Sequence, residues 1–279
     1  MSKRKFKHKA TTFNKANLTY LAHCANIAYK SKEEIRQELN TLGFDVDGTN
    51  FFFENRDKAE GVDTQCFVTG DKDKIIVSFR GSEAKLTDWL TNKRFIKIKW
   101  SKDKTFGRVH RGFHKALKGV WPDVREEILR LRTNKQPIWL TGHSLGGALA
   151  QLAAATLRFQ EKQDWVGGVY TFGQPRAGNS DFAKKYNSHL KNVTCRVVNN
   201  NDLVARIPTI NYSHAGQLFY FSSKETLHRD KQMSWWEKKL DRLKGRIKGF
   251  PNGKTDGIDD HSMDRYQELC EKTSQAKQE

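Results

Sequence analysis

One short stretch, Gly142-His-Ser144-Leu-Gly146, constrains the fold of this chain more than any other. The apolar run before it, residues 138–140, predicts a strand, and the alanine- and leucine-rich run after it, residues 148–159, predicts a buried helix. So sharp a turn from strand to helix requires small neighbours and strains the backbone at Ser144. We therefore expect the Ser144 hydroxyl to stand exposed at the end of a sheet, as a nucleophilic serine does.

A serine hydroxyl is a poor nucleophile by itself, so Ser144 needs a base and an acid elsewhere in the chain. After a turn of this kind the partners follow in the order Ser, then Asp or Glu, then His. The acid candidate is Asp202, which follows a β-branched strand pattern at 193–198. An Asx turn or a helix cap is the other common use of an Asp in such an Asn-rich loop. The chain order favours the catalytic role.

Three histidines follow Asp202 in the sequence. His261 precedes a short final helix and lies in a late loop, where we expect the base. His214 is the rival; it stands close to Asp202 in sequence and is expected to pack beneath the site. His228 lies in a charged stretch and is expected at the surface. The sequence therefore predicts a triad of Ser144, Asp202 and His261.

Further motifs surround the serine turn in a fixed order. They are the stretches 77–82, 88–90, 109–113, 142–147, 171–176 and 201–208, and Asp260-His261 ahead of Tyr266. Together they resemble the class 3 lipase family, the α/β-hydrolase lipases typified by filamentous-fungal triacylglycerol lipases. The resemblance covers roughly residues 60–266 and implies a serine hydrolase acting on lipid esters by the triad above.

The resemblance also implies how the reaction's negative charge is held. Ser82 matches the family's oxyanion-hole position, so its N–H and hydroxyl would join the N–H of Leu145 in binding the oxyanion. Each such donor is typically worth ~3 kcal/mol of transition-state stabilisation. A turn residue after a strand is the plain alternative for Ser82, and it is compatible with that role.

Lipases of this family cover the site with a short helical lid after the oxyanion strand, which here is segment 83–92. Leu86, Trp89 and Leu90 have the i, i+3, i+4 spacing of an apolar helix face. A lid would turn this face to the site when closed and to lipid when open. The alternative is an ordinary surface helix packed on the core.

Strand-like runs alternate with helical runs through the middle of the chain, which predicts an α/β fold with a mostly parallel central sheet flanked by helices. The runs are 65–69, 74–79, 137–141, 167–172, 193–199 and 217–221, the first two forming a hairpin. The 279 residues suit one α/β-hydrolase domain. We expect residues 1–15 to form a basic flexible tail and residues 16–275 to form that single domain.

The net charge of +18 lies largely in residues 1–10 and 229–254. In the second segment Trp236, Leu240 and Leu243 share one helical face, with lysines and arginines on the others. This pattern suits an interfacial helix on an anionic membrane surface. The pattern slightly favours the other reading, a helix that packs its apolar stripe on the domain and leaves its cations in water.

No metal or cofactor is expected. The four cysteines lack metal-ligand spacing, and the chain has no HExxH, P-loop or dinucleotide-binding pattern. The basic start lacks the apolar segment of a signal peptide, and no apolar run is long enough to span a membrane. We therefore expect a cytoplasmic protein, with export by a route without a cleaved signal as the alternative.

Two other functions fit parts of the sequence. One is a non-lipid carboxylesterase, which the same triad would serve. The other is a membrane- or nucleic-acid-binding protein on a hydrolase scaffold, in line with the high pI. Nucleic acid is the less expected partner, because every catalytic position is filled and a binding scaffold does not need them.

Overall fold

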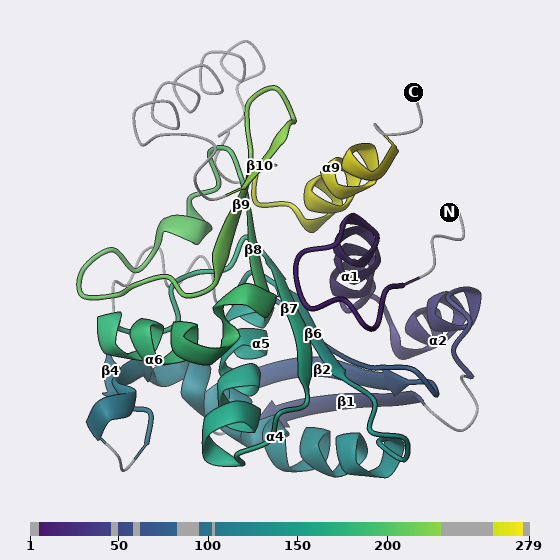
Figure 1. Ribbon diagram of the computed structural model, residues 1–279, viewed down its shortest axis with the longest axis horizontal. Helices are drawn as coiled ribbons and strands as arrows, with labels where there is room; N and C mark the ends of the chain where they lie inside the picture. Colours follow the sequence, from purple (N-terminus) through teal and green to yellow (C-terminus); the bar gives the residue numbers. More distant parts are fainter. Residues whose placement is uncertain are drawn as a thin grey trace.

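The six expected strands and two further edge strands form one eight-stranded sheet in the computed structural model, which describes residues 6–45, 50–57, 62–82, 95–101, 104–229 and 259–275 (Figure 1). The sheet order is β1-β2-β3-β6-β7-β8-β9-β10. The strands are β1 (Asn50–Asp57), β2 (Val62–Gly70), β3 (Ile75–Phe79), β6 (Ile138–His143), β7 (Val166–Phe172), β8 (Thr194–Asn199), β9 (Gln217–Phe221) and β10 (Leu227–Arg229).

The centre of the sheet is parallel and its edges are antiparallel. The five strands from β3 through β6, β7 and β8 to β9 pair in parallel. β1, β2 and β10 pair antiparallel at the two ends. The hairpin expected between the first two strand patterns is β2–β3, with Gly70 opposite Ile75. A separate two-stranded sheet joins β4 (Lys97–Lys99) to β5 (Arg108–His110). The prediction of a mostly parallel α/β fold is confirmed.

Helices cover both faces of the sheet (Figure 1). One face packs against α4 (Arg111–Leu131), α5 (Leu145–Ala155) and α6 (Ser180–Leu190), and the other against α1 (Lys15–Ile27), α2 (Lys32–Thr41) and α9 (Met263–Gln275). Short turns complete the described helices: η1 (Lys104–Phe106), η2 (Thr156–Gln160), η3 (Lys191–Val193) and η4 (Val204–Arg206).

Successive side chains of a strand point to opposite faces, so the buried strands supply two cores at once. In β3, Val77 and Phe79 join the core under α4 and α5, whereas Ile76 joins the core under α1 and α9. All five residues of β3 are buried. This two-sided burial explains why the strand reads as a continuous apolar run rather than an alternating one.

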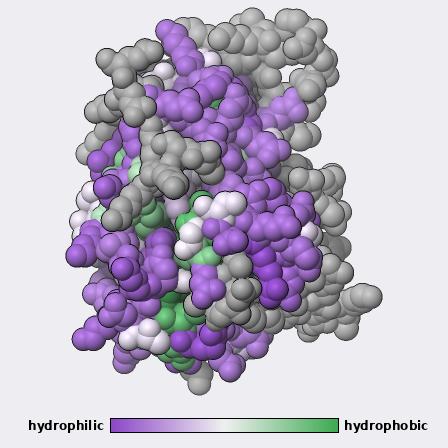
Figure 2. Space-filling model, turned by 90° about the vertical axis from the view of Figure 1, so that its right-hand side faces the viewer, coloured by the Kyte–Doolittle hydropathy of each residue, from purple (hydrophilic) through white to green (hydrophobic). Residues whose placement is uncertain are grey.

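Helices from the two ends of the described chain lie side by side on one face (Figure 1). The Thr19 hydroxyl of α1 lies 2.6 Å from that of Ser274 in α9, and the Asn26 amide donates to Asp264 at 2.9 Å. The surface on this side of the molecule is mainly hydrophilic, with small hydrophobic patches (Figure 2). Both helices thus direct their apolar sides toward the sheet.

The segment ahead of α1 differs from the flexible tail expected over residues 1–15. The Phe6 ring is 7% exposed and meets the Trp139 ring edge-on, with centroids 4.9 Å apart. Phe13 stacks on Phe219 at 4.2 Å. The described part of that segment therefore packs on the sheet, while the basic residues 1–5 lie outside the described residues. A single domain over 16–275 stays a prediction.

Candidate active site

The strand-to-helix turn has the geometry that its sequence predicts. Ser144 lies between the end of β6 and the start of α5 with φ 55° and ψ −124°. A non-glycine residue in this region is strained and persists only where its surroundings hold it. A Cβ on Gly146 would collide with the carbonyl oxygen of Phe79, which explains the small residue there. The Ser144 hydroxyl does not cap α5, so it is left for other partners.

Ser144 is not exposed in the way the sequence suggested, because it retains only 4% of its accessible surface. Its N–H donates to the carbonyl of Phe172 at 2.9 Å. The loop after β3 lies against it, since a Cβ on Gly81 would sit 3.1 Å from the Ser144 Cβ. Segments that follow neighbouring strands therefore enclose the serine at the carboxyl edge of the sheet.

Asp202 and His261 are in direct contact. Nδ1 of His261 lies 2.9 Å from Oδ2 of Asp202, and both side chains are buried. The Tyr266 hydroxyl donates to the same carboxylate oxygen at 2.6 Å. The other oxygen accepts the N–H groups of Val204 and Ala205 at 2.8 and 3.2 Å. Asp202 therefore accepts the N–H groups of a turn through one oxygen and contacts His261 through the other, and its catalytic role stays a prediction.

The opposite nitrogen of His261, Nε2, is buried and has no hydrogen-bond partner among the described residues. The His261 ring lies 4.5 Å from the ring of His143, the residue before Ser144. Gly173 makes room for the pair: with φ +59°, a Cβ there would lie 2.7 Å from Asp202 Oδ2 and 2.8 Å from His261 Nδ1. The arrangement leaves Nε2 as the ring nitrogen available to Ser144.

The rival histidines lie elsewhere. His214 is held near Arg196 and Arg176, and burial followed by these two cations lowers its pKa well below the ordinary range. His228 belongs to β10, where it pairs with Tyr220. In the described part of the chain, His261 is the late histidine that is hydrogen-bonded to Asp202.

The two residues expected in the oxyanion hole flank the serine. Leu145 is the first residue of α5, where backbone N–H groups lack helical partners. Ser82 directly follows Gly81, the residue packed against Ser144, and is half-buried. The lid candidates Leu86, Trp89 and Leu90 lie outside the described residues, as does segment 229–254 apart from Arg229.

Three site residues were missed by the reading of the sequence. The first is Tyr266, which bonds Asp202. The second is His143, whose Nε2 lies 2.6 Å from the backbone carbonyl of His261. The third is Tyr29, whose hydroxyl lies 2.7 Å from Nδ1 of His143. His143 and Tyr266 had a sequence signal, since each stands in one of the motifs quoted above, whereas Tyr29 had none.

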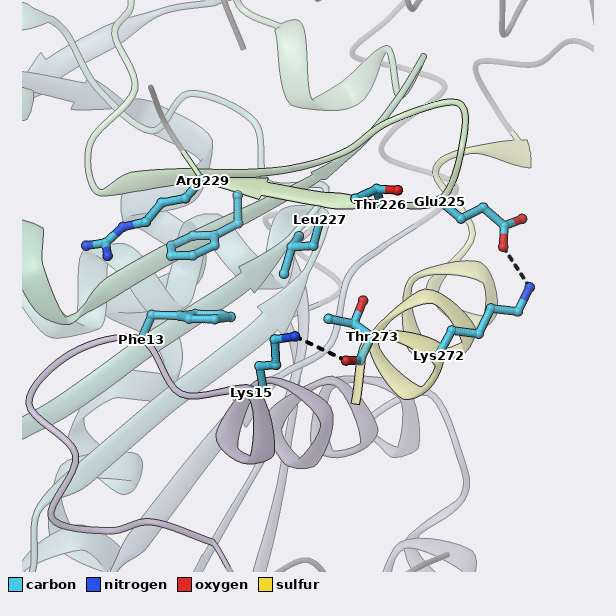
Figure 3. A pocket seen from close by; sticks show the side chains of 9 residues that line it. Phe13, Lys15, Glu225, Thr226, Leu227, Arg229, Lys272 and Thr273 are labelled. Carbon is cyan, nitrogen blue, oxygen red and sulfur yellow. Dashed lines mark hydrogen bonds and ion pairs between the residues drawn. The ribbon is translucent and has the colours of Figure 1, made fainter. Parts of the chain in front are cut away.

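Two cavities of the described residues are lined by other parts of the fold. One, of ≈ 460 Å³, lies between Phe13, Lys15, the β9–β10 hairpin and α9; in Figure 3 the Phe13 ring and Leu227 face its interior. The other, of ≈ 510 Å³, is lined by Lys97, Arg108 and polar neighbours. Among the residues that the structure describes, no three His, Cys, Asp or Glu side chains gather as they would around a metal ion.

Comparison with known proteins points to one family. Residues 76–212 match the family described as Lipase (class 3). The chain is 30% identical over 219 residues to the triacylglycerol lipase OBL1 of Arabidopsis thaliana, covering 60% of this chain and 42% of that protein. It is 32% identical over 156 residues to the secreted mono- and diacylglycerol lipase 1 of Fusarium solani, covering 55% and 45%. The chain thus spans less than half the length of these two relatives.

Solved structures of similar fold are also lipases. One is a triacylglycerol lipase described as having a serine-protease triad at its catalytic centre, with TM-score 0.65, 24% identity and coverage of 80% of this chain and 88% of that one. Another is the mono- and diacylglycerol lipase of Aspergillus oryzae, with TM-score 0.65, 21% identity and coverage of 82% and 90%. At these identities the likeness establishes the α/β-hydrolase fold.

The expectation of a cytoplasmic protein is wrong. Similar lipases of Fusarium solani and Malassezia restricta are named as secreted proteins. The expectation rested on the start of the chain, which is weak ground for a sequence that matches only part of its relatives. Within the described residues, no helix has the length and apolar character needed to cross a bilayer.

Proposed function

Because residues 76–212 of this chain match the class 3 lipase family, we propose that it is a serine carboxylic-ester hydrolase of that family that acts on lipid esters. The observation that carries the proposal is the bond between His261 Nδ1 and Asp202 Oδ2, beside a serine at a strained strand-to-helix turn. The reaction passes through an acyl-enzyme formed on Ser144.

The chemistry follows from these groups. Nε2 of His261 takes the hydroxyl proton of Ser144 as the oxygen attacks the ester carbonyl. The same nitrogen then protonates the departing alcohol, and water releases the fatty acid by the reverse sequence of proton transfers. Asp202 keeps Nδ1 protonated and stabilises the imidazolium that forms in each half of the reaction.

We assign the oxyanion hole to the N–H groups of Ser82 and Leu145. The close packing of Gly81 on Ser144 and the position of Leu145 at the start of α5 support this assignment. A helix N-terminus favours negative charge, and each preorganised donor typically contributes ~3 kcal/mol in the transition state.

Three features of substrate access belong to the same proposal. The spacing of Leu86, Trp89 and Leu90 supports a lid over segment 83–92, and the lysines and arginines of segment 229–254 support binding to an anionic membrane surface. The relatives' names support acylglycerols as substrates. The net charge of +18 favours anionic phospholipid as a further acyl donor.

The test is hydrolysis of three substrates by the wild type and by Ser144→Ala. The substrates are p-nitrophenyl esters of increasing chain length, a triacylglycerol emulsion and anionic phospholipid vesicles. We expect fatty-acid release from a lipid interface and a loss of about 10⁴-fold or more in the variant, with unchanged thermal unfolding.

Each other outcome has a definite meaning. Activity confined to short soluble esters replaces the lipid hydrolase with a plain carboxylesterase. Wild-type turnover in Ser144→Ala contradicts the mechanism. Salt-sensitive DNA binding without any esterase activity moves the assignment to a nucleic-acid-binding protein on this scaffold.

A further inference from the structure

His143 makes two hydrogen bonds whose directions can be worked out. Its Nε2 lies 2.6 Å from the backbone carbonyl oxygen of His261, which can only accept, so Nε2 carries a proton. Its Nδ1 lies 2.7 Å from the hydroxyl of Tyr29. A neutral imidazole has one N–H, so Nδ1 accepts and the Tyr29 hydroxyl donates. The chain of bonds therefore runs from Tyr29 through His143 to the backbone of His261.

His143 is held in its neutral form. Burial lowers the pKa of His143 well below its usual range, and the nearby His261 adds to that effect. Its ring lies 4.5 Å from the His261 ring at an angle of 35°. A positive charge at His143 would oppose the imidazolium that His261 becomes during the reaction, because like charges at this distance repel. A neutral ring supports His261 without that penalty.

Tyr29 lies where three segments of the site meet. It follows the end of α1, and a Cβ on Gly81 would collide with its hydroxyl oxygen, so the hydroxyl lies directly against the loop that leads to Ser82. Its ring also lies under the Arg80 guanidinium, 5.5 Å from the centroid. One hydroxyl thus touches the oxyanion loop and fixes the ring of the residue before Ser144.

Asp202 orients the His261 ring at one nitrogen. The loop is held at the preceding residue, Asp260, by hydrogen bonds from Asn199 and Asn201. These bonds do not hold the carbonyl of His261 itself. The bond from His143 to the His261 carbonyl fixes this group. With Nδ1 and the carbonyl of His261 both held, the orientation of its ring is fixed, and with it the direction of the unpartnered Nε2. An error of about 1 Å in such a group can lower a rate by about 100-fold.

We propose that Tyr29 is a positioning residue that aligns His261 with Ser144 through the hydrogen-bonded ring of His143. The inference rests on the proposed ester hydrolysis for its kinetic consequence. Tyr29 does not need to touch the substrate for this role. It fixes the positions of the strand-to-helix turn at Ser144, the loop that leads to Ser82 and the loop that carries His261 relative to one another.

The kinetic test compares Tyr29→Phe with Tyr20→Phe on a soluble p-nitrophenyl ester. Both tyrosines come from α1 or its end, but the Tyr20 hydroxyl has no hydrogen-bond partner among the described residues, so its removal leaves the site bonds intact. We expect Tyr29→Phe to lower kcat by about tenfold with little change in KM, and Tyr20→Phe to match the wild type. Equal kcat in the two variants overturns the proposal.

A double-mutant cycle asks whether Tyr29 acts through His143. In His143→Phe the ring has neither a donor for the His261 carbonyl nor an acceptor for the Tyr29 hydroxyl, so both bonds of the proposed chain are lost. We expect Tyr29→Phe to have no further effect on kcat in that background. A second tenfold loss there means that Tyr29 acts by another route and overturns the proposed chain.

A spectroscopic measurement separates this inference from the proposed activity. In ¹⁵N-histidine-labelled protein, we expect His143 to show a protonated Nε2 and an unprotonated, hydrogen-bonded Nδ1, with the Nδ1 signal shifting in Tyr29→Phe alone. A protonated Nδ1 in the wild type overturns the inference even if no ester is hydrolysed. An inactive wild type with the expected spectrum overturns the proposed function and the catalytic role, while leaving the bond itself established.

Discussion

On one face of the sheet α5 packs through alanine and leucine side chains, whereas on the other face α1 adds hydrogen bonds from two strand hydroxyls to its apolar contacts. Ser78 donates to the carbonyl of Cys24 at 2.9 Å and Thr141 to that of Leu21 at 3.0 Å. Apolar attraction has no preferred direction, but a hydrogen bond does. The bonds therefore fix α1 along its axis as well as in distance.

The difference matters because the hydrogen-bonded face leads to the proposed catalytic groups. Tyr29 follows α1, His261 lies just ahead of α9, and Tyr266 lies in the first turn of α9. Of the three triad residues, Ser144 is the one that adjoins a helix of the other face, α5. We infer that the α4–α5 face mainly sets the free energy of unfolding, while the α1–α9 face sets the geometry of the site. Four predictions test this division.

The largest effect on activity is expected for Asp202→Asn, because Asp202 contacts both His261 and Tyr266. An amide nitrogen at the Oδ2 position cannot accept from His261 and Tyr266, so the histidine loses its orientation and tautomer. We expect kcat for a soluble ester to fall by about 10⁴-fold. A loss below tenfold, measured on protein that remains folded by circular dichroism, contradicts the assigned role of Asp202.

The next effect is one of stability, at Leu149→Ala in α5. This side chain is fully buried in the core beneath the helix. Truncation should lower the free energy of unfolding by about 3 kcal/mol, through lost burial and the cavity left behind. Urea unfolding measures the loss. Turnover per active serine, titrated with a fluorophosphonate, should stay at the wild-type value; a parallel fall in kcat breaks the proposed division.

A smaller effect should appear with pH, because His110 is a buried polar group on the α4 side. Its Nδ1 lies within 3.2 Å of the Gly112 N–H at the start of α4, and burial lowers its pKa to about 4. Below about pH 6.5 His110 takes up a proton in the unfolded chain but stays neutral in the folded protein. The free energy of unfolding therefore falls by up to about 1.4 kcal/mol per pH unit. Above pH 6.5 His110 is neutral in both states, so this loss of stability is absent there.

The pH effect is measured by urea unfolding between pH 7 and 5 in the wild type and in His110→Asn. Asparagine caps helices well but does not titrate in this range. The variant should show a shallower loss of stability toward acid pH. Two identical slopes would remove His110 as a source of the dependence; His143 and His214, whose pKa values burial also lowers, act in the same direction.

The smallest effect is expected at Thr141→Val, which removes a donor shared by the carbonyls of Leu21 and Tyr170. The loss should be about 1 kcal/mol of unfolding free energy. Thr171→Val is the matched control, because the Thr171 hydroxyl is buried without a hydrogen-bond partner among the described residues. If the control costs as much as Thr141→Val, the bond to α1 contributes nothing and the comparison of the two faces loses its basis.

The parts of the fold that were predicted depend on local patterns. The parallel strands read as apolar runs because both faces are covered, and the Gly-x-Ser-x-Gly turn follows from the small residues on either side of Ser144. The edge strands β1 and β10 were not predicted. β10 has three residues, too few for a periodic signal, and a strand at an edge is defined by its neighbour as much as by its own residues.

The candidate site also has a part that the sequence predicted and a part that it did not. Chain order and loop position were enough to select Asp202 and His261, which the structure brings within 2.9 Å of each other. The local pattern could not decide whether Asp202 caps a turn or orients a histidine, and the fold lets it do both. The burial of Ser144 was not foreseen, because it depends on loops that follow other strands.

By itself the sequence determined the strained serine turn and the layered α/β architecture, since each depends on sterics and periodicity within a short window of residues. The partners of Ser144 were selected by their order along the chain. Only the tertiary structure decided how Tyr29 and Tyr266 support His143 and Asp202. Tyr29 and His143 are 114 positions apart, and Asp202 and Tyr266 are 64 apart. Bonds across such separations form only after the helices pack on the sheet, because packing sets the distance between groups that no local pattern relates.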